Sequence, residues 1–175
     1  MSFPRYESYR DSGTAWLGSV PAHWRTRRLR TLVEIKKRIA GFEGPDVLSI
    51  TQRGIRVREL DSNDGQLAES YAHYQVVEAG DFAMNHMDLL TGWVDIANQD
   101  GVTSPDYRVF TLRANSELYA TYLLRILQNG YSNRIFYAFG QGASHFGRWR
   151  LPTDAFQEFV VPLPPPERLT QKDVE

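Results

Sequence analysis

The spacing of apolar positions predicts two substantial helices. The first is predicted over residues 24–35, where five apolar side chains can share one face: Trp24, Leu29, Leu32, Val33 and Ile35. The second is predicted over residues 117–128, where apolar residues recur at helical spacing and Asn129 with Gly130 provides the stop. A shorter helix is expected directly afterwards, over residues 133–139.

The chain between the two main helices is predicted to form short strands. Apolar runs mark strands at 47–50, 55–58, 74–77, 82–85, 93–97 and 107–112, with a last strand at 156–161. Residues 63–65, Asn-Asp-Gly, form a strong turn signal. Because the connections are too short for helical crossovers, the strands are expected to pair antiparallel. The predicted fold is α+β: a mostly antiparallel sheet that could close into a barrel, with flanking helices.

Length and composition indicate one folded domain. The 175 residues, 42% apolar and 13% aromatic, are enough for a core, and no apolar run is long enough to span a membrane. Residues 1–15 are expected to form an irregular arm, residues 16–166 the domain, and residues 167–175 the start of a helix that is cut short. The absence of cysteine excludes disulfides and thiolate zinc sites, and a cytoplasmic location fits this composition.

Charge is distributed unevenly along the chain. Residues 1–60 hold twelve basic and six acidic side chains, whereas residues 61–130 hold three and ten. A uniformly basic face for DNA therefore cannot be inferred from composition. Arginine outnumbers lysine seventeen to three, which favours planar, bidentate recognition of guanine or phosphate. Four arginines on the polar side of the first predicted helix could contact phosphate or simply face solvent: Arg25, Arg27, Arg28 and Arg30.

The common catalytic patterns fail in this sequence. Residues 104–107, Ser-Pro-Asp-Tyr, lack the first amide or carboxylate and the second proline of the amino-methyltransferase loop. A metal-dependent nuclease of the Pro-Asp type needs a lysine two residues after a carboxylate, and the only downstream lysine, Lys172, has threonine in that position. There is no P-loop, and the four histidines are scattered. We therefore expect no catalyst, metal site or cofactor.

Six short segments occur in an order that resembles one known family. They are Trp16 to Trp24 with its internal Gly and Pro; residues 47–51 followed by Gly54 and Ile55; residues 74–82 around Gly80; Asn85 with Met87 and Asp88; residues 101–107; and the proline-rich close at 159–165. Together they resemble a target-recognition domain from the DNA-specificity subunits of type I restriction-modification systems. The motif residues themselves, such as Asp81 and Pro105, are interpreted mainly as structural.

The resemblance implies a non-catalytic subunit that reads DNA. In that family a full subunit carries two recognition domains separated by two long spacer helices, and each domain reads one half of a bipartite site. The resemblance implies double-stranded DNA, methyltransferase subunits and, through the complex, a restriction and translocase subunit as partners. The sequence is expected to depart from this pattern, with one recognition domain and only the start of a spacer helix at Glu167.

Two polar loops are the candidates for reading bases, because such side chains can bond base edges. The first loop offers Gln52, Arg53, Arg56 and Arg58. The second, residues 140–150, is rich in glycine and offers Gln141, Ser144, His145, Arg148 and Arg150. A plain connecting role stays open for each loop. Weaker candidates are Asn85, His86, Asn133 and Arg134.

Two alternative functions remain open at this point. The chain could be the specificity domain of a type II restriction-methylation enzyme, which would share the fold. It could also be an orphan half-subunit that acts mainly as a protein-interaction module for a methyltransferase, with self-association of half-subunits. The mildly acidic net charge of −1 is compatible with the second alternative.

Overall fold

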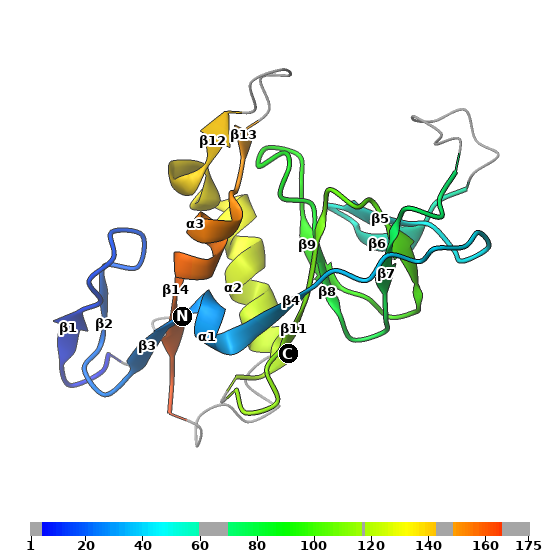
Figure 1. Ribbon diagram of the computed structural model, residues 1–175. Helices are drawn as coiled ribbons and strands as arrows, with labels where there is room; N and C mark the ends of the chain where they lie inside the picture. The colour runs from blue at the N-terminus through cyan, green and yellow to red at the C-terminus, as the bar shows by residue number, and fades with distance from the viewer. Residues whose placement is uncertain (1–4, 60–69, 117, 143–148, 166–175) are drawn as a thin grey trace.

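A four-stranded antiparallel sheet crosses the middle of the molecule (Figure 1). The computed structural model describes residues 5–59, 70–116, 118–142 and 149–165. The central sheet has the order β4-β11-β8-β9, formed by Val33–Lys36, Arg108–Leu112, Phe82–Met84 and Val94–Ile96. Helices cover one face and two-stranded sheets cover the other, so this sheet is buried on both sides.

The helical face holds the larger core. It is covered by the one-turn helix α1 (Leu29–Leu32), by α2 (Ala120–Ser132) with the 3-10 helix η1 (Phe136–Phe139), and by α3 (Thr153–Glu158). Phe82 and Phe110 are register partners on neighbouring strands, and their rings stack with centroids 4.9 Å apart. Phe156 of α3 packs on Phe110 with centroids 5.1 Å apart. Aromatic packing therefore fixes α3 to the sheet.

The opposite face carries a smaller core under two strand pairs. One pair is β5 (Leu48–Thr51) with β6 (Gly54–Val57), and the other is β7 (Gln75–Val77) with β10 (Gly101–Thr103). Val109 packs here with Leu48 and Val77, whereas its neighbour Phe110 packs in the larger core. Successive residues of a strand point to opposite faces, so β11 serves both cores.

The remaining strands lie at the two ends of the helical side. At one end, β1 (Tyr9–Asp11) pairs with β2 (Ser19–Pro21), and β3 (Arg25–Arg28) pairs with β14 (Val160–Leu163). At the other end, β12 (Gln141–Gly142) pairs with β13 (Trp149–Arg150) (Figure 1). Trp16 of the first sequence segment stacks on Phe159 with centroids 4.9 Å apart, which is a structural role.

The prediction of a helix over residues 24–35 is wrong. The segment forms β3, a single turn of helix and β4. Its apolar residues are still buried or partly buried, because Leu29, Leu32 and Val33 enter the larger core from different elements. The strands form because β14 and β11, more than 70 residues away in sequence, supply their hydrogen-bonding partners. Long-range pairing has overridden a local helical period.

The expected end of the long helix at Asn129 and Gly130 is also wrong. Helix α2 continues to Ser132, and the left-handed residue that follows its end is Arg134, with φ of 55°. Gly130 is buried inside the helix because the ring of Phe136 lies against it, where a Cβ atom would approach within 2.4 Å. Glycine is therefore needed at this position because the ring of Phe136 approaches the helix closely, and it does not end the helix.

Two further expectations differ from the structure. Residues 156–158 belong to α3, and the last strand begins only at Val160. The described strands form separate small sheets and do not close into a barrel. The antiparallel pairing of named strands and the α+β class are confirmed, and the expected arm contains a strand, β1. The predicted turn at 63–65 and the predicted tail helix at 167–175 lie outside the described residues. Among the described residues, no helix is long and apolar enough to cross a membrane.

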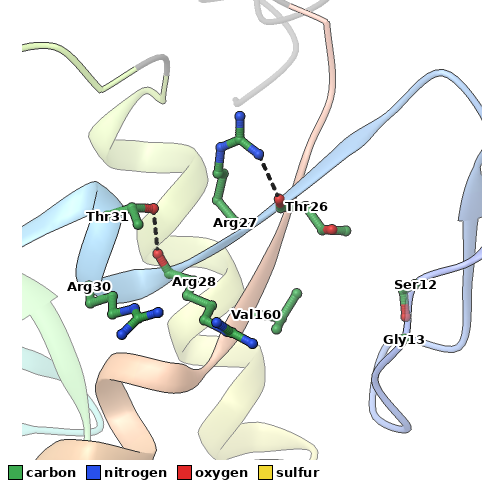
Figure 2. Close-up of a pocket in the computed structure, with 8 residues that line it drawn as sticks. All are labelled: Ser12, Gly13, Thr26, Arg27, Arg28, Arg30, Thr31 and Val160. Atoms are coloured by element: carbon green, nitrogen blue, oxygen red, sulfur yellow. Dashed lines mark hydrogen bonds between the residues drawn. The ribbon is translucent and has the colours of Figure 1, made fainter.

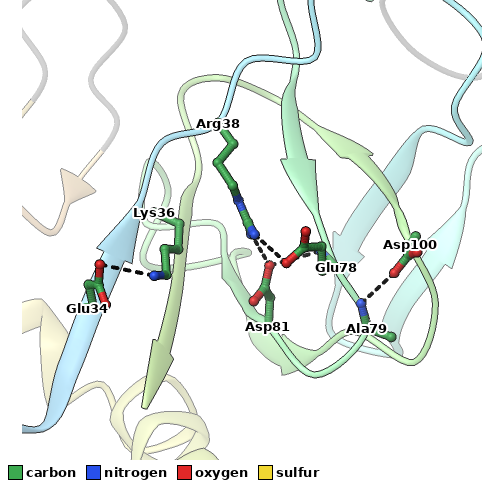
Figure 3. Close-up of polar contacts among 7 residues, drawn as sticks. All are labelled: Glu34, Lys36, Arg38, Glu78, Ala79, Asp81 and Asp100. Carbon is green, nitrogen blue, oxygen red and sulfur yellow. Dashed lines mark hydrogen bonds and ion pairs between the residues drawn. The ribbon is translucent and has the colours of Figure 1, made fainter. Parts of the chain in front are cut away.

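A polar network fixes the turn that leads into β8 (Figure 3). Arg38, which follows β4, bonds the carboxylates of Glu78 (2.5 Å) and Asp81. Burial alone would lower the pKa of Arg38, but the hydrogen bonds and charges of these two carboxylates raise it. Asp81 is buried and also accepts the backbone N–H of Glu78. The motif around Gly80 and Asp81 is therefore structural, as interpreted from the sequence.

We predict that Gly130→Ala lowers the free energy of unfolding by about 1–3 kcal/mol, although alanine is the better helix former. The new methyl group would overlap the ring of Phe136. Chemical denaturation with far-ultraviolet circular dichroism measures the change. Thr121→Ala, at an exposed position of the same helix, is the control and should keep or slightly raise the stability. An equally stable Gly130→Ala variant would contradict the proposed packing.

Candidate nucleic-acid interface

The first hairpin, residues 48–57, presents its three candidate residues to solvent, and the fourth candidate of this loop, Arg58, comes directly after it. Gln52 and Arg53 form the turn between β5 and β6, Arg56 lies on β6, and all three are exposed. Arg58 follows the strand and is only partly exposed. The turn is held by Thr51, whose hydroxyl donates to the carbonyl of Gly54 (2.9 Å) and accepts the N–H of Arg53 (3.1 Å).

The second hairpin, residues 141–150, is described only at its base. Gln141 and Arg150 are register partners there, and both are exposed. Trp149 anchors the base, because its indole N–H donates to the carbonyl of Tyr137 (2.7 Å) and its ring stacks on that tyrosine. The remaining candidates of this loop, Ser144, His145 and Arg148, lie outside the described residues.

Both hairpins attach to one connection, the bridging loop of residues 85–93 between β8 and β9. The N–H of Leu89 donates to the carbonyl of Trp149 (2.8 Å), and the N–H of Leu151 donates to the carbonyl of His86 (2.9 Å). On its other side, the side-chain amide of Gln52 donates to the carbonyl of Leu90 (3.4 Å). Figure 1 shows β5–β6 and β12–β13 on either side of this loop. The structure thus links the two segments that the sequence predicted separately.

The bridging loop is itself closely held. Asp88 accepts the N–H groups of Leu90 (2.9 Å) and Thr91 (3.2 Å) on one carboxylate oxygen and the hydroxyl of Thr91 (2.8 Å) on the other. Gly92 lies against the backbone, where a Cβ atom would approach the carbonyl oxygens of Asn85 and Asp88 within 2.3 Å. Asx-type bonds and a required glycine therefore define one shape for the loop.

A hollow of about 370 Å³ opens beside the bridging loop. Gln52 of the first hairpin, Leu90 and Trp93 of the loop, and Arg134 after α2 line it. Arg134 is exposed and has φ of 55°, a strained conformation for a residue with a side chain. Of the weaker candidates, Arg134 lines this hollow with Gln52, and Asn85 and His86 are the first two residues of the bridging loop. Asn133 caps α2 and is exposed.

Arg108, which the sequence analysis did not single out, is a buried cation beneath the bridging loop. Its Nη2 donates to the carbonyl of Leu151 (3.3 Å) and the hydroxyl of Thr153 (3.2 Å), and its guanidinium lies 4.5 Å from the centre of the Phe156 ring. Burial lowers the pKa of Arg108 to about 10, so it stays charged at neutral pH. Nothing in the sequence distinguished it from other arginines, because its role depends on burial.

His86 is held neutral beside this cation. Burial, followed by the charge of Arg108, lowers the pKa of His86 to about 3. Within the described part of the chain, no three His, Asp or Glu side chains come together in a way that could hold a metal ion. Around the bridging loop, the exposed side chains of Gln52 and Arg134 offer hydrogen bonds and positive charge.

A second cationic surface lies at the far end of the helical side (Figure 2). Arg27, Arg28 and Arg30 line a groove of about 390 Å³ together with Ser12 and Thr31. Arg28 and Arg30 both pair with Glu158, at 3.0 and 3.2 Å. Because a carboxylate already occupies two of its three arginines, this groove is the weaker candidate for phosphate. Figure 1 shows β3 well separated from β12 and β13.

Solved structures with a similar fold come from type I restriction-modification systems. The HsdS subunit from Thermoanaerobacter tengcongensis matches 95% of this chain and 38% of its own length, at 16% identity and a TM-score of 0.52. The fold is that of part of a type I specificity subunit. A chain from a structure concerned with complex assembly and conformational transition of the type I system matches 85% of this chain and 36% of its own length, at 17% identity and a TM-score of 0.52.

The specificity-subunit fold confirms the resemblance that the six sequence segments indicated. The chain spans 36–38% of the length of these two subunits. No family model and no curated protein matches the chain in sequence. The recognition from short motifs is thus supported by the shared fold, at identities of 16–17%.

We predict that His86 makes the protein less stable in weak acid. The pKa of His86 in the folded protein, about 3, lies below the ordinary value of 6.5. As the pH falls below 6.5, His86 therefore binds a proton in the unfolded chain but stays neutral in the folded one. The contribution of neutral His86 to the free energy of unfolding is fully present above pH 6.5 and is lost as the pH falls towards 3. Between about pH 7.5 and about pH 5.5 it should lower the free energy of unfolding by about 1 kcal/mol.

Urea denaturation of His86→Gln across that range tests this expectation, since glutamine does not titrate. The variant should have a shallower pH dependence than the parent, whereas Thr121→Ala, which removes no titratable group from an exposed position of α2, should keep that of the parent. Identical pH profiles for His86→Gln and the parent would show that His86 titrates normally in the folded protein.

Proposed function

We propose that this chain binds a short DNA sequence as the target-recognition domain of a restriction-modification specificity subunit. The observation that carries the proposal is the attachment of both candidate hairpins to the bridging loop. This arrangement supports two polar segments reaching one stretch of duplex together. The shared fold with type I specificity subunits supports the same function.

The side chains around the bridging loop have the chemistry that base reading requires. Gln52 can bond adenine, and Arg53 or Arg56 can bond guanine or phosphate. These residues are exposed on a two-stranded ribbon, an element that fits the major groove of B-DNA. Arg134 adds a further positive charge at the hollow. Binding, without chemistry on the DNA, is the function that this set supports.

Within a restriction-modification complex, the domain would read one half of a bipartite site. It would direct methyltransferase subunits, and through them a restriction and translocase subunit, to that site. Each good bidentate contact contributes roughly 1–3 kcal/mol of base discrimination, so a half-site of a few base pairs limits what one domain can achieve alone. Partner subunits would therefore raise the affinity of the assembled complex.

A selection from randomised duplexes at low salt tests the proposal, with and without a methyltransferase subunit. Enrichment of one short word, in either condition, is the expected result. Enrichment only with the subunit would show that affinity is assembled from several chains. Capture of the methyltransferase without any enriched word would overturn the proposal in favour of a protein-interaction module.

We predict that Arg53→Gln and Arg56→Gln weaken binding to the selected word by about five-fold to a hundred-fold, as expected for loss of a direct contact. Fluorescence anisotropy over a salt series measures the effect. A base-reading arginine would change preference at one position, and a phosphate-binding arginine would reduce the salt slope by about one. Arg125→Gln, at an exposed site on α2, is the matched control and should bind like the parent.

We predict that exchanging residues 141–148 for the loop of a relative changes the selected word. Gly140 and Trp149 are kept, because a Cβ atom at Gly140 would collide with the indole and the Trp149 carbonyl holds the bridging loop. The exchange then alters side chains at the tip and leaves the anchor intact. Unchanged selectivity in a folded, DNA-binding exchange variant would remove this hairpin from the interface.

A further inference from the structure

We propose that Leu90 and Gln52 read one A·T base pair together, with the leucine on the methyl group of thymine and the glutamine on adenine. The inference rests on the proposed DNA-binding function and names a specificity residue that the polar candidates did not include. It starts from an exposed leucine at the centre of the candidate interface, 53% accessible to solvent.

Leu90 is held outward by the structure of its turn. The neighbouring Leu89 is 3% exposed and belongs to the larger core, so the loop has one leucine inside and one outside. The carboxylate of Asp88 binds the N–H of Leu90 at 2.9 Å, and the N–H of Gly92 donates to the carbonyl of Asp88 at 2.8 Å. A fixed backbone presents this apolar side chain at little further entropic cost on binding.

The contact between Gln52 and Leu90 places an amide next to that apolar side chain. One N–H of the Gln52 amide donates to the Leu90 carbonyl at 3.4 Å. A primary amide has a second N–H and a carbonyl oxygen, and these are the two groups needed for a bidentate contact with adenine N7 and N6. The bond to Leu90 therefore orients the amide and leaves its adenine-binding edge available.

Adenine and thymine of one base pair present complementary features in the major groove. Adenine offers the acceptor and donor that an amide pairs with, and thymine offers its C5-methyl group to an apolar side chain. Gln52 and Leu90 supply both partners from adjacent positions on two elements that are bonded to each other. The pair would thus favour A·T, because the other base pairs fail to match at least one of the two side chains.

Replacing thymine by uracil in the selected duplex isolates the methyl contact. We expect one thymine whose replacement weakens binding by the parent about four-fold, the value for loss of one buried methyl group. Leu90→Ala should bind the thymine duplex about four-fold more weakly and no longer distinguish thymine from uracil at that position. Gln52→Ala should lose preference for adenine in the same base pair. The measurement is competition binding with each thymine replaced in turn.

Two control variants make the result interpretable. Leu90→Met keeps an apolar side chain and should keep sensitivity to uracil. Ile39→Ala removes an equally exposed apolar residue outside both hairpins and the bridging loop, and it should bind like the parent. Thermal denaturation of each variant shows that the fold is retained, as expected for exposed positions.

The outcomes separate this inference from the proposed function. If the parent selects a word and Leu90→Ala keeps the same sensitivity to every uracil, the A·T reading is wrong while DNA recognition stands. Loss of methyltransferase binding by Leu90→Ala, with unchanged DNA preference, would assign the leucine to a protein contact instead. If the parent selects no word with or without its partner, both proposals fail.

Discussion

The bridging loop lies between the two candidate hairpins and is bonded to both. It has one shape because Asp88 ties its turn together and because only glycine fits at position 92. Its base continues directly from β8, which is buried on both faces between the two hydrophobic cores. Any displacement of the loop would therefore disturb the central sheet. The first hairpin is also held from the sheet side, because Leu48 of β5 packs in the smaller core with Val77 and Val109.

Buried charge beneath the loop adds to this constraint. Arg108 is buried without a carboxylate partner among the described residues. Its Nη2 donates to a backbone and a hydroxyl oxygen and its guanidinium lies over the Phe156 ring, whereas its buried Nη1 has no hydrogen-bond partner. Such an arrangement tolerates little movement, because a buried guanidinium that lost these contacts would carry a large desolvation penalty. Its charge adds to burial, which is the larger cause, in lowering the pKa of His86. Arg108 thus connects β11 to the segment that follows the second hairpin.

Sequence patterns predicted the class of fold and about half of the described strands, and they failed where distant residues decide. The apolar positions of residues 24–35 fit a helix, yet Arg25–Arg28 and Val33–Lys36 become strands because of partners far away in the chain. Gly130 looked like a helix stop, and only the ring of Phe136 reveals its role. The local sequence does not show which distant residues will pair or pack with a segment, so these errors could not be corrected without the structure.

For the candidate site too, the sequence indicated the residue types but not the contacts between distant segments. The exposed positions of Gln52, Arg53 and Arg56 agree with the residue types that the sequence singled out. The convergence of the hairpins could not be foreseen, because backbone groups of residues 86–90 make the connection and any sequence has such groups. Leu90 was overlooked for a related reason, since an exposed leucine and a buried one look alike in a sequence.

The second hairpin is joined to the bridging loop through main-chain atoms on both sides: Leu89 to Trp149 and Leu151 to His86. A main-chain hydrogen bond survives almost any change of side chain. In the proposed function, substitutions at the tip of this hairpin can therefore alter what is recognised while its attachment to the loop is kept. A DNA-reading domain built in this way could change its target in small steps, because the contacts that hold the hairpin do not depend on the side chains that would be exchanged.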